Sequence, residues 1–206
     1  PRAPSGRGLA SVAGVACTGP EARGRGVGTG GVGVSHRGGA AAEYMAAPAT
    51  TLYPVPQRFS DEQAAGAAGP YLTADAAIVT LGRLQKGEDV LIPAATGPFA
   101  SAAVPLCRAY GAGRIIATAG SEQKAAKVLQ WGADVAVDYR TTDFVEVVRE
   151  TTKGRGLPLV LDSVGGDVLG RSVDCVSLGG RLVRVGASSG RRTRRFRRQT
   201  LCERGR

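Results

Sequence analysis

Histidine, clustered cysteine and long apolar runs are scarce in this chain of 206 residues. The single histidine is His36, and the four cysteines, Cys17, Cys107, Cys175 and Cys202, are far apart with no Cys-x-x-Cys pair. This distribution excludes a disulfide-rich scaffold and any standard zinc site. No apolar run approaches the roughly 18 to 20 residues of a membrane helix, and the first residues lack the apolar stretch of a signal peptide. We therefore expect a globular protein of the cytoplasm with no membrane partner.

Acidic residues are outnumbered, but the positive charge is concentrated at one end. The formal net charge is +10, and residues 191–206 hold eight arginines and one glutamate, so the rest of the chain is close to neutral. Such a run can bind phosphate backbones, and Phe196 could stack on a base. Because blocks of like charge rarely fold, we predict a disordered arginine-rich tail at 191–206 and disfavour a nucleic-acid partner.

Large apolar residues are nearly missing from residues 1–31, which are rich in Gly, Arg, Ala and Pro and are therefore predicted to be disordered. Beyond them, two short extended pieces are expected at about 42–47 and 51–55. Ser60 is a typical N-cap for a short helix that we expect to end at Gly69-Pro70, and a second helix is predicted over about 71–84.

Short apolar runs then alternate regularly with helical patterns. Buried strands are predicted at 89–92, 114–118, 134–137, 159–162 and 182–185, and helices are expected to start near 98, 121, 142 and 166. Strands separated by helices pair in parallel, because parallel neighbours need long right-handed connections. The predicted fold class is therefore α/β, with a doubly wound parallel sheet of about five strands.

Two glycine motifs match known patterns without the context that those patterns need. Residues 26–31 read G-x-G-x-x-G, but no strand precedes them and no helix follows. Residues 186–190 read G-x-S-x-G after a predicted strand, which suggests a serine nucleophile at Ser188. A serine hydrolase needs a histidine after that serine, whereas His36 lies far upstream. The hydrolase stays an alternative that we disfavour.

Small residues follow several of the predicted strands. The turn at 94–101 joins a strand to a helix, where backbone N–H groups and the helix dipole can hold a pyrophosphate. The next strand end carries no acidic residue to bind a ribose 2′-hydroxyl, whereas Ser121 and Lys124 could bind a 2′-phosphate, which favours NADPH over NADH. A plain N-cap and a solvated lysine are the alternative interpretation. The glycines at 165–166 and 186 would meet this turn at the carboxyl edge of the sheet.

Five longer segments carry a family pattern: AEYMAAPATTLYPVP, YLTADAAIVTLGRLQKGEDVLI, GAGRIIATAGSEQKAAKVLQWGADVAVDYRTTDF, GRGLPLVLDSVGGDVLGRSV and GGRLVRVGASSG. Over about residues 38–190 the chain resembles the zinc-independent quinone oxidoreductases (zeta-crystallin-like) of the medium-chain dehydrogenase/reductase superfamily. The resemblance implies an NADPH-dependent reductase that transfers hydride to a small-molecule quinone or activated alkene (enone). It also implies that residues 32–69 are a remnant of a GroES-like substrate domain and residues 70–190 an NADP-binding Rossmann domain. Polyketide-type enoyl reduction is a near neighbour.

The resemblance also implies which residues contact the cofactor, although it names no acid or base. The pyrophosphate loop would be Thr96, Gly97, Pro98, Phe99, Ala100 and Ser101, and the 2′-phosphate contacts would be Ser121, Lys124 and Tyr139. Further cofactor contacts at the strand ends would be Gly120, Gly166, Val185, Gly186, Ala187 and Ser188, and Thr73 would lie near the nicotinamide. Tyr139 and Arg140 have a chemical rationale as well, since a phenol and a guanidinium can clamp a phosphate.

Some residues depart from the family pattern. Pro98 and Ala100 replace two glycines of the usual A-x-G-G-V-G loop, and Pro98 removes an N–H although it suits a first helical position. Pro105 lies inside a predicted helix, and Arg184 in a strand must face an exposed edge or be paired. Family-like sequence stops at both ends, so we expect a truncated or frame-disrupted product, with a non-catalytic cofactor-binding remnant as the alternative. An open sheet edge could pair with that of a second copy of the chain, which would give a homodimer.

Overall fold

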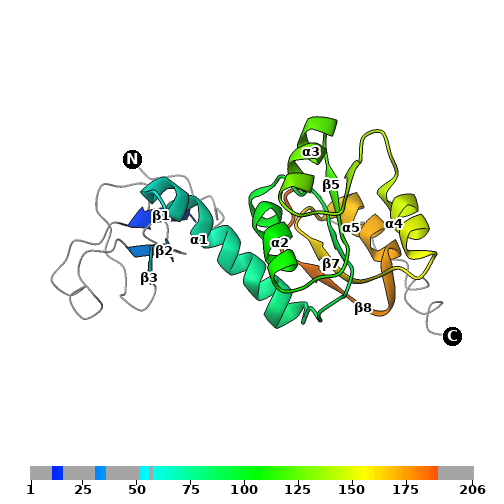
Figure 1. The fold of residues 1–206 in the computed structure, drawn as a ribbon, viewed down its shortest axis with the longest axis horizontal. Helices are drawn as coiled ribbons and strands as arrows, with labels where there is room; N and C mark the ends of the chain where they lie inside the picture. The colour runs from blue at the N-terminus through cyan, green and yellow to red at the C-terminus, as the bar shows by residue number, and fades with distance from the viewer. Residues whose placement is uncertain (1–10, 16–30, 36–51, 56–57, 190–206) are drawn as a thin grey trace, which may run out of the picture. The chain divides into compact units, whose positions relative to one another are not determined.

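The computed structural model describes residues 11–15, 31–35, 52–55 and 58–189 (Figure 1). The chain divides into two compact units, residues 1–72 and 73–206, which we describe separately. The extended piece expected at 42–47, most of the segment 1–31 and the tail 191–206 lie outside the described residues. The domain limits drawn from the sequence therefore stay predictions.

The first unit contains a small antiparallel sheet. Strands β1 (Ser11–Val15), β2 (Gly31–Ser35) and β3 (Leu52–Pro54) lie in the order β1-β2-β3. Strand β3 matches the extended piece expected at 51–55. Strand β1 falls within residues 1–31, where we expected no fold, because composition does not reveal the backbone partners that β2 provides across the sheet.

Helix α1 (Asp61–Asp75) begins as the sequence indicates and continues further than expected. The Gln63 N–H donates to Ser60 Oγ at 3.2 Å and the Ser60 N–H donates to Gln63 Oε1 at 3.0 Å, which is a reciprocal capping box. The predicted break at Gly69-Pro70 is wrong, since α1 runs through Pro70 and passes into the π-helix η3 (Ala76–Leu81). Pro70 removes one backbone donor, but buried Ala74 and Ile78 in the second unit hold the following turns in place.

The second unit is a five-stranded sheet with the order β6-β5-β4-β7-β8, and every pairing in it is parallel. Its strands are β4 (Val90–Ile92), β5 (Ile115–Ala119), β6 (Val135–Asp138), β7 (Leu157–Asp162) and β8 (Val176–Arg184), and its helices are α2 (Pro98–Ala109), α3 (Glu122–Gln130), α4 (Phe144–Thr152) and α5 (Gly166–Asp174). The doubly wound sheet predicted from the sequence is confirmed. Strand β8 starts six residues earlier than expected, with an irregular register opposite β7 between Leu157 and Leu159.

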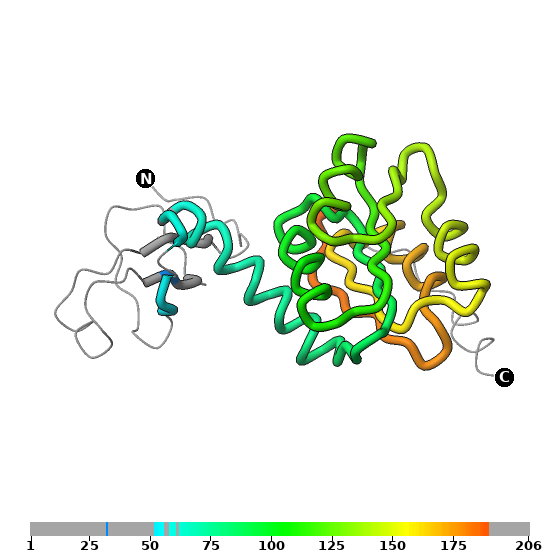
Figure 2. The backbone as a smooth tube through the Cα atoms, in the orientation of Figure 1, coloured from blue at the N-terminus to red at the C-terminus, as the bar shows by residue number. Residues whose placement is uncertain are grey.

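Two apolar cores lie on opposite faces of this sheet. Alternate strand residues such as Ile92 and Ile115 pack with α2, whereas Leu91 and Ile116 pack with Phe144 of α4. Figures 1 and 2 show α2 and α3 on one side of the sheet and α4 and α5 on the other. Strand β4 is fully buried because helices cover both faces and strands flank both edges.

Helix α2 accommodates the proline that the sequence marks as a problem. It runs unbroken through Pro105, with Val104 and Cys107 fully buried against the sheet. Burial of apolar surface on this scale, roughly 1.5 to 3 kcal/mol for each large side chain, offsets the hydrogen bond that Pro105 removes. The same burial raises the pKa of the Cys107 thiol to about 12.

A partly buried ion pair ties β8 to the segment before β4. Arg181 donates to both carboxylate oxygens of Glu88, at 2.9 and 2.5 Å, and its Nε donates to the Gly82 carbonyl at 2.7 Å. Arg181 lowers the pKa of Glu88 from its ordinary value. Arg184, in contrast, is exposed on the edge strand and donates to the Gly186 carbonyl, as the sequence requires of an arginine there.

We predict that Glu88→Gln lowers the free energy of unfolding at pH 7 by about 1 to 3 kcal/mol, because a bidentate, partly buried pair is lost. Since the pKa of Glu88 is lowered on folding, its contribution is complete above the unfolded value and is lost as pH falls through the lower folded value. The difference between the two proteins in urea unfolding should therefore shrink in acid. Glu146→Gln, in the more exposed Glu146–Arg149 pair, is the matched control. Equal effects of the two variants would contradict the assignment.

Candidate cofactor-binding site

The strand order creates a crevice at the carboxyl edge of the sheet. Strands β4 and β7 are neighbours, and the helices that follow them, α2 and α5, lie on opposite faces. Chains that leave neighbouring strands in opposite directions leave a gap outside the strand ends, which is where ligands bind in open α/β sheets. The loops after all five strands meet at this edge.

The loop after β4 is a tight turn fastened to β5. Ala94 adopts a left-handed conformation (φ 51°), and its N–H donates to Thr118 Oγ1 at 3.1 Å. The Ala95 N–H donates to the Thr118 carbonyl at 2.7 Å, and the Gly97 N–H closes the turn on the Ala94 carbonyl at 3.0 Å. These hydrogen bonds hold Thr96 and Gly97 at the N-terminus of helix α2.

Helix α2 begins with Pro98 at its first position, as its fixed φ allows, and Gly97 is an N-cap without a side-chain acceptor. The Ser101 N–H already donates to the Gly97 carbonyl, and Ser101 Oγ donates to the Pro98 carbonyl. The side chains of Phe99 and Ala100 are buried in the core. Because Pro98 has no N–H and the Ser101 N–H is already used, the N–H groups of Phe99 and Ala100 are the donors of the first turn. This turn can hold an anion with two donors.

Tyr139 joins the ends of β5 and β6. A Cβ atom added to Gly120 would lie 2.9 Å from the Tyr139 hydroxyl, so the phenol lies directly against this glycine. Ser121 caps α3 by accepting the Lys124 N–H at 3.2 Å, and the Lys124 side chain is exposed. The capping role considered from the sequence is therefore real. The Ser121 hydroxyl keeps its proton to donate, and it follows directly after the contact between Gly120 and Tyr139.

The sequence interpretation did not single out Asp138, the last residue of β6. It accepts the Arg140 backbone N–H at 3.0 Å, and its two carboxylate oxygens accept from the Arg140 guanidinium at 3.3 Å. These interactions lower the pKa of Asp138 and raise that of Arg140. Arg140, which we expected to clamp a phosphate together with Tyr139, is paired with this carboxylate instead.

Asp162 organises the loop after β7; the sequence places it at a predicted strand end but assigns it no role. It is fully buried and accepts the N–H groups of Val164 at 2.8 Å and of Gly165 at 3.1 and 3.2 Å. The Asp162 carbonyl accepts the Val185 N–H at 2.7 Å, which joins this loop to the end of β8. The sequence feature that could have indicated this role is an acidic residue directly after an apolar strand.

The loops after β7 and β8 pack backbone against backbone. Gly165 has φ 75°, and a Cβ there would lie 3.2 Å from Ala187 Cα. A Cβ on Gly186 would lie 3.2 Å from the Ser163 carbonyl oxygen, which also accepts the Ser188 N–H. Glycine at both positions allows this close approach. The loop of residues 163–166 and the loop of residues 185–188 therefore form one packed surface at the strand ends, which we call the double loop.

Two residues that the sequence analysis considered, Thr73 and His36, remain to be described. Thr73 lies on the exposed side of α1, and its role near a nicotinamide stays a prediction. His36, the base that a hydrolase at Ser188 would need, lies outside the described residues. Within the part of the chain that the structure describes, no cluster of three metal-ligating side chains occurs. No helix among those residues is long and apolar enough to cross a membrane.

We predict that Gly165→Ala lowers the free energy of unfolding by about 1 to 3 kcal/mol, because an alanine at this positive φ is strained and meets Ala187. Gly170→Ala in α5 is the matched control, since a Cβ there meets nothing within 4 Å. In that variant the free energy of unfolding should rise by about 0.5 to 1 kcal/mol, because alanine has the higher helix propensity. Thermal unfolding of both proteins tests the pair, and equal shifts would argue against the packed double loop.

Known proteins are similar to this chain in sequence. The sequence model of the family described as zinc-binding dehydrogenase matches residues 98–205. Human quinone oxidoreductase is 31% identical over 149 residues, which are 72% of this chain and 45% of that protein. The mycocerosic acid synthase-like polyketide synthase of Mycolicibacterium smegmatis is 36% identical over 132 residues, 64% of this chain and 6% of that protein.

A solved structure matches the fold as well. Escherichia coli quinone oxidoreductase, determined in complex with NADPH, is 34% identical, with a TM-score of 0.69. The match covers 76% of this chain and 48% of that one, so the chain spans about half the length of this enzyme. The family model, which covers residues 98–205, shows that this chain belongs to the zinc-binding dehydrogenase family of the medium-chain dehydrogenase/reductase superfamily, and quinone oxidoreductases are among the proteins to which it is similar.

Proposed function

We propose that the second unit binds NADPH at the carboxyl edge of its sheet, as part of an oxidoreductase that transfers hydride to a quinone or an enone. The observation that carries the proposal is the meeting of three elements at the carboxyl edge: the Gly97 turn, the Ser121–Tyr139 corner and the Gly165–Gly186 double loop. The NADPH complex of the similar Escherichia coli enzyme supports this choice of cofactor.

The residues at this edge suit NADPH. Small residues let backbone come close to a pyrophosphate, and α2 presents its positive end there. Strand β5 ends in Ala119 and is followed by Gly120, so no carboxylate at its tip would repel a 2′-phosphate. Pro98 leaves one N–H fewer than a glycine-rich loop provides. We expect the dinucleotide to bind through the remaining donors.

Each part of the site has a distinct task in this proposal. The N–H groups of Phe99 and Ala100 hold the pyrophosphate, and Ser121, Lys124 and Tyr139 hold the 2′-phosphate. Gly166, residues 185–188 and Thr73 border the nicotinamide. When bound, NADPH supplies the hydride, and the chain contributes orientation and exclusion of water.

The electron-accepting substrate is proposed as a class. Quinones and enones are both activated for hydride addition, and the human and Escherichia coli relatives favour the quinone. Enoyl reduction is the second candidate, because the solved CurK enoyl reductase is 31% identical with a TM-score of 0.65. A cofactor-binding chain without catalysis is the alternative. Oxidation of NADPH with a quinone, an enone or an enoyl thioester as acceptor separates these possibilities.

Three further features belong to the proposal. We infer that hydride transfer needs no zinc, because one histidine and four scattered cysteines provide no standard ligand set. We place the protein in the reducing cytoplasm, which the buried thiol of Cys107 supports. A homodimer is proposed because β8 is an edge strand of its sheet.

We predict that Lys124→Ala weakens NADPH binding by about 3- to 10-fold and leaves NADH binding unchanged, because only NADPH carries the phosphate that Lys124 is proposed to hold. Lys127→Ala is the matched control, since Lys127 lies one turn further along α3 over the Trp131 ring. Fluorescence titration with both cofactors measures the effect. A similar loss of NADPH affinity in the two variants, or a loss of NADH affinity in Lys124→Ala, would contradict the assigned 2′-phosphate site.

A further inference from the structure

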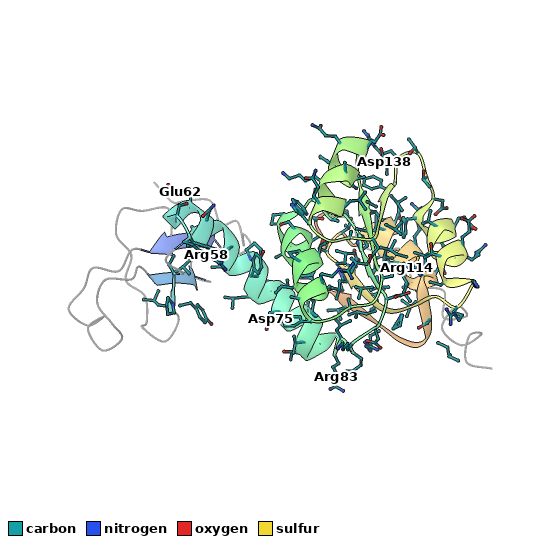
Figure 3. The ribbon with its side chains drawn as sticks, in the orientation of Figure 1. Arg58, Glu62, Asp75, Arg83, Arg114 and Asp138 are labelled. Atoms are coloured by element: carbon teal, nitrogen blue, oxygen red, sulfur yellow. The ribbon has the colours of Figure 1, made fainter. Side chains whose placement is uncertain are left out.

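Asp138 and Arg140 form a charged pair at the border of the 2′-phosphate site. Asp138 is the register partner of Ala119 across β5 and β6, and Ala119 immediately precedes Gly120 and Ser121. Arg140 directly follows Tyr139, whose hydroxyl lies against Gly120. Figure 3 shows Asp138 beside α3, at the other end of the unit from Arg83. Two opposite charges therefore lie next to the place proposed for a dianionic phosphate.

Asp138 restrains both the loop and the arginine. Its carbonyl accepts the N–H groups of Thr141 and Thr142, and its carboxylate accepts the Arg140 N–H. The Arg140 guanidinium lies on the same carboxylate, with Nε and Nη2 each 3.3 Å from an oxygen. In this position, the forked donors that suit a phosphate are directed at a carboxylate.

The pair is nevertheless weak enough to be broken. The Arg140 side chain is 58% exposed, whereas that of Asp138 is 16% exposed. A pair with contacts this long and an exposed arginine contributes little to stability, because water screens the guanidinium and the arginine loses rotamer freedom. Removing the carboxylate would release Arg140 without unfolding the loop.

We propose that Asp138 limits the preference for NADPH, because it neutralises Arg140 and keeps this guanidinium away from the 2′-phosphate. The inference rests on the proposed function, since it assigns Asp138 a specificity role at that same site. Asp138 acts through Arg140 and is a positioning residue. Its removal should strengthen binding of the phosphorylated cofactor, which is the opposite of what loss of a merely structural residue would do.

The test compares the full chain with Asp138→Asn, Arg140→Gln and the double variant. An asparagine at 138 can still accept the Arg140 N–H, so the turn is retained. Titrations use NADPH against NADH and 2′,5′-ADP against 5′-AMP, because each pair of probes differs by the 2′-phosphate. Asp138→Ser, whose hydroxyl also accepts that N–H, replaces the asparagine variant if it does not fold.

We expect Asp138→Asn to bind NADPH and 2′,5′-ADP about 3- to 10-fold more tightly, with NADH and 5′-AMP within about twofold of the unchanged chain. The gain should largely disappear in the double variant, because it depends on the freed Arg140. No gain in Asp138→Asn, or a full gain without Arg140, would overturn the inference. Failure of the unchanged chain to bind NADPH would instead refute the proposed function, which separates the two outcomes.

Discussion

Parallel pairing of β4 on both of its edges is the constraint on which the rest of this structure depends. Val90 and Leu91 pair with β5 on one side and β7 on the other, and all three β4 residues are fully buried. Because the connections from β4 and β7 run to opposite faces, the crevice outside their ends follows from the topology. The packed cores on both faces hold this edge in place, and with it the loops to which we assign the cofactor.

Polar groups at the strand ends mainly position backbone. Thr118 fastens the turn after β4, Asp162 gathers the N–H groups of the following loop, and Ser121 caps α3. Each interaction fixes a loop that would otherwise be free to move, and each leaves small residues at the surface of the crevice. This arrangement suits the proposed dinucleotide, whose binding would depend on backbone donors and close approach.

Much of this arrangement could be predicted from the sequence, because the regular alternation of apolar runs and helical patterns specifies a parallel sheet. The predicted helix break at Pro70 was wrong. A glycine-proline pair indicates only a local preference for a break, and it carries no information about the burial of Ala74 and Ile78 further along the chain. The Asp138–Arg140 pair was missed for a related reason. Which of two nearby partners an arginine takes depends on the turn between them, and that turn is set by hydrogen bonds that only the folded loop reveals.

We propose above all that a dinucleotide lies across the carboxyl edge of the second unit. The decisive experiment is an amide NMR titration of the isotopically labelled full chain with NADPH. We expect saturable shifts at Gly97, Gly120, Gly165 and Gly186, and little change at Gly87 and Gly111, which lie before β4 and β5. Shifts confined to the opposite edge, or no saturable shift, would contradict it.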